Sequence, residues 1–272
     1  MAYVALRERV SIRRRGPRRL AIHSRLRGLR EISTLDRCVA ARSSLSGWRA
    51  WGIAGNSSAM RLTIRPLTPD LWPAFEDLFG KSGACNGCWC MYWRIGSAYR
   101  ERPRERNKAD FRKVVMEGPP PGLLAFDGDA AVGWCQLAPR ASLPHLEHAR
   151  ALKRVDDAPV WTISCFYVRR GYRKQGVTAA LIDAAIKAAR RAKAPGLEAY
   201  PVDTEAGKST SGMYTGKAST FARAGFMEVA RHAAHRPIVR HDLKSKRVRQ
   251  RVSRGDTDGG KEISRQGAKT PR

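Results

Sequence analysis

Short runs of apolar residues, some alternating with polar ones, recur along the middle of the chain. Alternation favours a strand with one buried face, whereas an unbroken β-branched and aromatic run favours a strand inside a sheet. These patterns predict strands at 62–67, 123–126, 131–137, 160–168, 197–202, 226–230 and 237–243. Asp127-Gly128-Asp129 is a turn signal that predicts a hairpin between the second and third of these strands.

Apolar residues spaced three and four positions apart predict helices at 71–79, 107–117, 177–192 and 219–224. The apolar stripe of the longest helix consists of Val177, Leu181, Ala184, Ala185, Ala188 and Ala192. Basic residues crowd its last turn, where the negative end of the helix dipole favours cations, and Pro195-Gly196 ends it.

The loop at 170–176 joins the strand at 160–168 to this helix and is rich in Arg, Lys and Gly. The first backbone N–H groups of a helix have no partner inside it, so with these cations they form a site for phosphate or pyrophosphate. Gly176 lets the backbone approach the anion closely. A P-loop is excluded because Val177-Thr178 replace its Lys-Ser/Thr, and Gly216-Lys217 lacks the first glycine. There is also no GxGxxG motif.

The stretch VRRGYRKQGVTAALIDAAI at 168–186 resembles the acyl-coenzyme A signature of the Gcn5-related N-acetyltransferase (GNAT) superfamily, Q/R-x-x-G-x-G/A. Residues 173–178 carry the match, and Thr178 stands where Gly or Ala is usual. The predicted order of elements also resembles that of the superfamily. The resemblance implies an α/β (α+β) fold whose central sheet is mixed, mostly antiparallel and flanked by helices.

The resemblance further implies acetyl-CoA as co-substrate and an amine as acceptor. The pantetheine arm would lie along Phe166, Tyr167 and Val168, and backbone N–H groups of a splayed central strand would hold the thioester oxygen. The cofactor-binding loop would comprise Arg173, Lys174, Gln175, Gly176, Val177 and Thr178.

The catalytic acid and base are not evident from the motif. The segment 221–226 resembles the superfamily's Y-x-K-x-G-F stretch, whose Tyr often protonates the leaving thiolate, but Phe221 stands in that place. Tyr214 and Tyr200 are substitute acids, although either could simply pack with its hydroxyl on a carbonyl. Glu198 is the candidate base. Further candidates for the base are Asp203, His145 and Glu147.

Three cysteines, Cys85, Cys88 and Cys90, fall within six residues, a spacing tight enough for zinc but without a local fourth ligand. The run at 88–94, CWCMYWR, resembles a CWCxYWR run of a little-characterised bacterial branch of the superfamily. Three interpretations stay open: metal ligation, core packing, and lining of the acceptor pocket. We assign no metal, and the expected substrate-binding residues are Cys88, Trp89, Tyr92 and Trp93. Cys165 is either a buried small residue or an acyl-carrying nucleophile.

The formal net charge of +28 is concentrated at the two ends of the chain. Residues 1–59 carry about +10 and residues 244–272 carry +7, which leaves +11 for the middle. We therefore expect an Arg-rich extension at 1–59, one acetyltransferase domain at 60–243 and a basic disordered tail at 244–272. The extension is a mis-assigned start, a disordered arm or a targeting segment.

The expected function is transfer of an acyl group, most often acetyl, from acyl-CoA to a primary amine of a small molecule or protein. Two alternatives remain: a relative that binds acyl-CoA without turnover, and a basic nucleic-acid-binding protein. The middle of the chain lacks a recognisable nucleic-acid motif, so nucleic acid is expected to bind only non-specifically through the tails. Six cysteines without a secretory signal indicate a reducing, cytoplasmic compartment. No apolar run suggests a membrane span, and a homodimer is possible.

Overall fold

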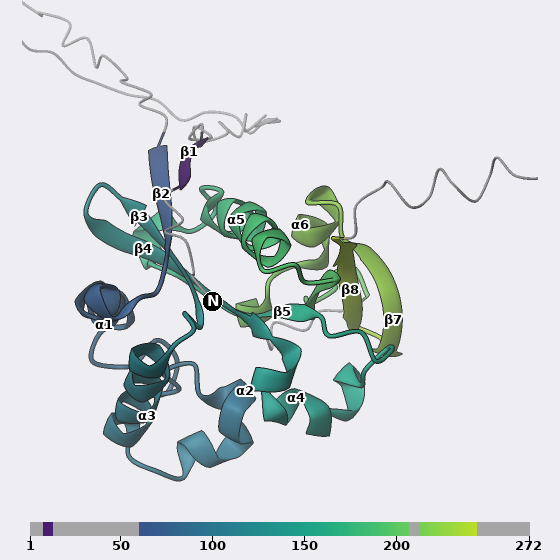
Figure 1. Cartoon of the computed structure of the whole chain (residues 1–272), viewed down its shortest axis with the longest axis horizontal. Helices are drawn as coiled ribbons and strands as arrows, with labels where there is room; N and C mark the ends of the chain where they lie inside the picture. The colour runs from purple at the N-terminus through teal and green to yellow at the C-terminus, as the bar shows by residue number, and fades with distance from the viewer. Residues whose placement is uncertain (1–7, 13–59, 207–212, 244–272) are drawn as a thin grey trace, which may run out of the picture.

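The computed structural model describes residues 8–12, 60–206 and 213–243 (Figure 1). Its eight strands are β1 (Glu8–Ile12), β2 (Met60–Pro66), β3 (Gly122–Asp127), β4 (Ala130–Pro139), β5 (Trp161–Val168), β6 (Gly196–Ala199), β7 (Met227–Ala233) and β8 (Arg236–Asp242). The α-helices are α1 (Trp72–Phe79), α2 (Tyr92–Ile95), α3 (Arg104–Glu117), α4 (Pro144–His148), α5 (Val177–Arg191) and α6 (Ala218–Arg223). No helix of the described chain has the length and apolar character needed to span a bilayer.

All eight strands form one sheet in the order β1-β2-β3-β4-β5-β6-β8-β7. Every neighbouring pair is antiparallel except β5 and β6, which are parallel. The prediction of a mixed, mostly antiparallel sheet flanked by helices is confirmed. The parallel pair arises because α5 carries the chain from the end of β5 back to the start of β6.

Strand β1 lies inside the segment 1–59 that we assigned to an extension, and it pairs with β2 along the edge of the sheet. The rest of that assignment, at 1–7 and 13–59, and the expected tail at 244–272 lie outside the described residues. The boundaries of the domain at 60–243 stay a prediction.

The sheet has helices on both faces (Figure 1). On one face α5 packs against the inner strands through a stripe of small residues, as its spacing predicted. Here Gly133 of β4 lies directly beneath the first turn of α5, because a Cβ at this position would stand only 2.6 Å from Cγ1 of Val177. On the other face α1 and α3 bury an aromatic cluster that includes Phe75, Phe111 and Trp134.

Strands β5 and β6 pair over three residues of β5 only, Trp161, Thr162 and Ile163. Beyond this point they diverge, so residues 164–168 have no strand partner on that side in the described part of the chain. A register shift in the β4–β5 ladder leaves Ser164 without a counterpart on β4 at the same point. Such a bulge bends a strand and redirects the residues that follow it.

Two regions need comment, one that differs from the sequence prediction and one for which no element was predicted. The strand expected at 197–202 is shorter, and β6 ends at Ala199, before Pro201. The residues around the cysteine run form turns rather than a regular element, with positive φ at Ala84, Asn86, Trp89 and Cys90. These positions matter for the site because they determine which side chains face the sheet.

Candidate functional site

The loop between β5 and α5 forms one wall of a cavity of about 620 Å³. Gly176 is the residue before the helix and has φ of +88°, a left-handed conformation that glycine adopts at least cost. Lys174 also has positive φ, at +62°. The guanidinium of Arg173 donates from Nε to the carbonyl oxygen of Val168 at 3.1 Å, which ties the loop back to β5.

Among the predicted loop residues, Arg173, Lys174, Gly176, Val177 and Thr178 line this cavity, and Val168 borders it from β5. Gln175 does not line it, because its amide Nε2 donates back to the carbonyl oxygen of Gly171 at 2.6 Å.

Two further cations, Lys217 and Arg223, line the cavity from the start and end of α6. Sequence reasoning missed both, since Lys217 was considered only as a failed P-loop lysine. None of the four lining cations forms an ion pair with a carboxylate of the described chain. Four such cations around the N-terminus of a 15-residue helix fit a polyanionic ligand such as a pyrophosphate.

A second cavity, of about 360 Å³, lies against the unpaired half of β5. Phe166 and Tyr167 line it from β5, and Tyr214 lines it from the short helix Met213–Thr215. The same two segments border the first cavity through Val168, Met213 and Gly216. The two cavities therefore follow one another along the strand.

Of the predicted substrate-binding residues, Cys88, Tyr92 and Trp93 line this second cavity. The indole of Trp93 donates from Nε1 to the carbonyl oxygen of Ser164 at 2.9 Å, so it holds the bulged residue of β5. The Ser164 hydroxyl donates in turn to Oε1 of Gln136 at 2.8 Å, and Nε2 of Gln136 donates to the carbonyl oxygen of Cys90 at 3.1 Å. This chain of bonds fixes the cysteine run against the bulge.

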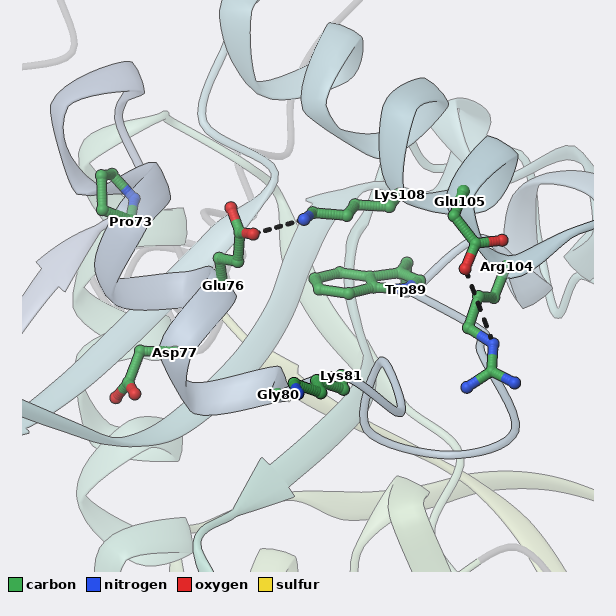
Figure 2. Close-up of a pocket in the computed structure, with 9 residues that line it drawn as sticks. All are labelled: Pro73, Glu76, Asp77, Gly80, Lys81, Trp89, Arg104, Glu105 and Lys108. Atoms are coloured by element: carbon green, nitrogen blue, oxygen red, sulfur yellow. Dashed lines mark hydrogen bonds and ion pairs between the residues drawn. The ribbon is translucent and has the colours of Figure 1, made fainter.

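Trp89 lies elsewhere, which corrects its assignment to the acceptor pocket. Trp89 and Cys90 both have positive φ, and the turn they form sends the indole of Trp89 away from the second cavity. The indole stacks on Trp72 and Phe79 in the aromatic cluster and lines a different cavity of about 700 Å³ between α1 and α3. Figure 2 shows it there beside Lys108, which pairs with Glu76.

Tyr200 and Glu198 also lie away from both cavities, a second correction. Tyr200 is fully buried, and its hydroxyl donates to Oε2 of Glu198 at 3.1 Å and accepts from Nη1 of Arg140 at 2.7 Å. The other oxygen of Glu198 accepts from Nη2 of Arg240 at 2.6 Å. A carboxylate held by two arginines inside the protein is a structural ion pair, so Glu198 is not placed to take a proton from an acceptor.

The other candidate bases are engaged as well. Asp203 pairs with Arg231 at 3.0 Å, and Glu147 pairs with Arg154 at 2.9 Å. His145 packs against the rings of Tyr92 and Trp93 outside the cavity lining. Within the part of the chain that the structure describes, no Asp, Glu or His side chain lines the second cavity.

Tyr214 is the one predicted acid that faces the second cavity. Its ring packs edge-to-face against the ring of Tyr92, with 6.3 Å between the two ring centroids. The residue is 38% exposed to solvent, but desolvation of the part that faces the cavity, followed by the neighbouring Tyr92, raises the pKa of Tyr214 above its usual value. The hydroxyl therefore stays protonated at neutral pH and is available as a proton donor. The expected position, Phe221, is buried in the core against Phe226 and has no access to this cavity.

Two cysteines of the second cavity, Cys88 and Cys90, are protonated thiols. Burial raises the pKa of Cys88 to about 11, with a smaller contribution from Cys165, and burial also raises the pKa of Cys90 well above its usual value. The sulfur of Cys90 accepts a hydrogen bond from the indole Nε1 of Trp134 at 3.0 Å. Over the described ranges, no three His, Cys, Asp or Glu side chains converge as metal ligands would.

Comparison with known proteins shows what this chain is similar to. Residues 87–208 match the acetyltransferase (GNAT) family. A putative acetyltransferase from Salmonella typhimurium, solved with its cofactor acetyl-CoA, is 14% identical with a TM-score of 0.41, over 67% of this chain and 94% of that one. PaiA N-acetyltransferase from Thermoplasma acidophilum, in complex with coenzyme A, is 14% identical with a TM-score of 0.40, over 66% and 98%. The GNAT domain of S. lividans PAT is 15% identical with a TM-score of 0.43, over 67% and 90%. No curated protein matches the chain.

Proposed function

We propose that this chain is an N-acetyltransferase that transfers an acetyl group from acetyl-CoA to an amine, a proposal supported by the match of residues 87–208 to the acetyltransferase (GNAT) family. The observation that carries the proposal is the alignment of two cavities along the unpaired half of β5. One cavity is cationic and lies at a helix N-terminus, and the other is narrow and largely aromatic. This arrangement supports a donor whose charged end and reactive end bind at opposite ends of the same strand.

The donor's phosphates would bind in the 620 Å³ cavity. Backbone N–H groups at the start of α5 would donate to the pyrophosphate, with Gly176 allowing the close approach. Side chains of Arg173, Lys174, Lys217 and Arg223 would neutralise the remaining charge. The cations of this cavity have no carboxylate competitor in the described chain, which leaves them available to a ligand.

The pantetheine arm would lie along Phe166, Tyr167 and Val168, whose outer edge is not paired with any strand of the described chain. Acetyl-CoA supplies an activated acyl group and a thiolate as leaving group. The backbone of β5 beyond the bulge would position the thioester and donate N–H groups to the negative charge that develops on its oxygen. The bond from Trp93 to Ser164 would keep this segment in place.

Tyr214 would act as the general acid. As the carbon–nitrogen bond forms and the carbon–sulfur bond breaks, its hydroxyl would give a proton to the sulfur and regain one from solvent. The amine proton would leave to water, because no carboxylate or His of the described chain lines the cavity. The amine must therefore be neutral when it attacks. Cys88, Tyr92 and Trp93 would form the wall against which the acceptor packs.

We further propose that residues 60–243 form the catalytic domain. The second candidate function is acyl-CoA binding without turnover, which Phe221 favours because the usual acid is missing from its position.

Two measurements test the proposal. Calorimetric titration of the protein with acetyl-CoA should give saturable binding at a single site, and a panel of amines should release free coenzyme A thiol in its presence. Absence of binding would refute the function outright. Binding with no thiol release across primary amines of small molecules and peptides would favour the second candidate.

A further inference from the structure

The second cavity, to which we assign the acceptor, carries positive charge. Two arginines, Arg100 and Arg236, line it, and no Asp, Glu or Lys is found among its described lining residues. A site built for a simple cationic amine would be expected to offer an anion, since an ammonium ion is repelled by guanidinium groups. This cavity offers the opposite charge.

Arg236 begins β8 and is half-buried. Its Nη1 donates to the hydroxyl of Thr215 at 2.8 Å and to the carbonyl oxygen of Tyr200 at 3.2 Å. These bonds orient the guanidinium without neutralising it, because both acceptors are uncharged. No carboxylate of the described residues forms an ion pair with it.

Arg100 approaches the cavity from the segment after α2 and is exposed. Its Nε donates to the hydroxyl of Tyr99 at 3.0 Å, so it too is oriented by a neutral partner. Like Arg236, it pairs with no carboxylate in the described part of the chain. The remaining N–H groups of the two guanidinium groups can make paired hydrogen bonds to an oxyanion.

We infer that the acceptor is a small amine that also carries a carboxylate or phosphate group, which Arg236 and Arg100 bind. The inference rests on the proposed acetyl transfer and specifies its acceptor. A volume of about 360 Å³ fits a small molecule, and the rings of Tyr92, Tyr99 and Trp93 suit a substrate with an apolar portion.

The same two cations account for catalysis without a carboxylate base. A positive charge near an amine disfavours its ammonium form and lowers its pKa. The arginines would thus hold the acid group of the substrate and increase the fraction of neutral amine at the site. The oxyanion offsets part of this field, so the effect is largest when the amine lies nearer to the guanidinium groups than to solvent.

The test compares pairs of amines that differ in the acid group. Phenylalanine is compared with phenylalaninamide, and O-phosphoethanolamine with ethanolamine. Each is titrated by calorimetry into protein saturated with coenzyme A, where no transfer can occur, and is then assayed with acetyl-CoA by thiol release. At least one acid-bearing member should bind roughly tenfold or more tightly than its neutral partner, the effect of one charge-assisted hydrogen bond. The pair that shows the preference identifies carboxylate or phosphate.

Substitutions assign the preference to the arginines. Arg100→Gln should reduce the preference for the acid roughly tenfold, and Arg236→Gln at least as much, whereas Arg236→Lys should retain part of it. Arg106→Gln, an exposed arginine of α3 outside the cavity lining, is the matched control and should leave the preference unchanged. Arg236 also holds Thr215, so a purely structural role would weaken acid and neutral members equally.

The outcomes distinguish failure of the proposed acetyl transfer from failure of the inference about its acceptor. If acetyl-CoA fails to bind, the proposed function is wrong and the inference is wrong with it. If acetyl-CoA binds and neutral amines bind and react as well as their acid partners, acetyl transfer stands and the inference is overturned. A preference for the acid that survives Arg100→Gln and Arg236→Gln would also overturn it.

Discussion

Replacing Gly176 with glutamate would place a carboxylate where we expect the pyrophosphate to bind. The residue precedes α5 with φ of +88°, and Arg173 and Lys174 lie beside it in the cavity wall. The introduced carboxylate would pair with these cations and occupy the anion position. Loss of a single charge-assisted hydrogen bond costs ~1.5–3 kcal/mol, so affinity for acetyl-CoA should fall by roughly tenfold to a hundredfold.

Backbone strain must be separated from charge in this experiment. A side chain in the left-handed region costs roughly 1–2 kcal/mol, which lowers the thermal midpoint of a domain of this size by about 2–8 °C. Gly176→Ala carries the strain without the charge, so it should lower the midpoint similarly while weakening acetyl-CoA binding much less.

Gly171→Glu is the matched charge control. It adds the same carboxylate to the same loop, but Gly171 is outside the cavity lining and no atom lies within 4 Å of the Cβ it would gain. Calorimetry should show near-normal affinity for this variant. The assignment of the phosphate loop is refuted if Gly176→Glu binds acetyl-CoA as tightly as the unmodified protein, or if Gly171→Glu is equally impaired.

Three further predictions concern the acid, the buried ion pair and the domain boundary. Tyr214→Phe should lower kcat by about 100-fold or more while leaving the calorimetric affinity for acetyl-CoA intact, and an unchanged kcat would exclude Tyr214 as the acid. Glu198→Ala should lower the free energy of unfolding in urea by roughly 2–3 kcal/mol, because Arg140, which is only 3% exposed, loses its buried partner and keeps only the partly exposed Glu147. The control Glu117→Ala removes one partner of an exposed pair and should change it by less than about 0.5 kcal/mol. A chain of residues 60–243 should fold with a thermal midpoint within a few degrees of the full chain, because β1 is the outermost strand of the described sheet and pairs with β2 alone. Aggregation of this shorter chain would place the boundary further upstream.

The parts of the site that could be predicted from sequence are those formed by residues adjacent to one another in the chain. The loop, Gly176 and α5 follow one another in the chain, and their apolar spacing fixes which side of the helix meets the sheet. The two cavities are also lined by cations from elements far along the chain, namely Lys217, Arg223 and Arg236. The sequence around these residues does not predict that they line a cavity.

The incorrect assignments have identifiable physical causes. Trp89 was grouped with its neighbours, but the positive φ of Trp89 and Cys90 reverses the direction of its side chain. Glu198 and Tyr200 are residue types that can serve as base and acid. In the fold Arg140 and Arg240 hold the Glu198 carboxylate, and they are 58 and 42 residues away from it along the chain. A buried carboxylate is distinguished from a catalytic one by such partners, and only the fold brings them together.

The close approach of Gly133 to Val177 connects the core of the protein to the proposed phosphate site. A larger residue at this position of β4 would have to displace Val177, and a shift of the first turn of α5 would move the N–H groups that we propose bind the donor, without any contact to the donor itself. Donor affinity could therefore be retuned by substitution beneath the helix, on a residue that no survey of ligand contacts would select. Among natural relatives, variation at this buried position would be a place to look for differences in affinity for the donor.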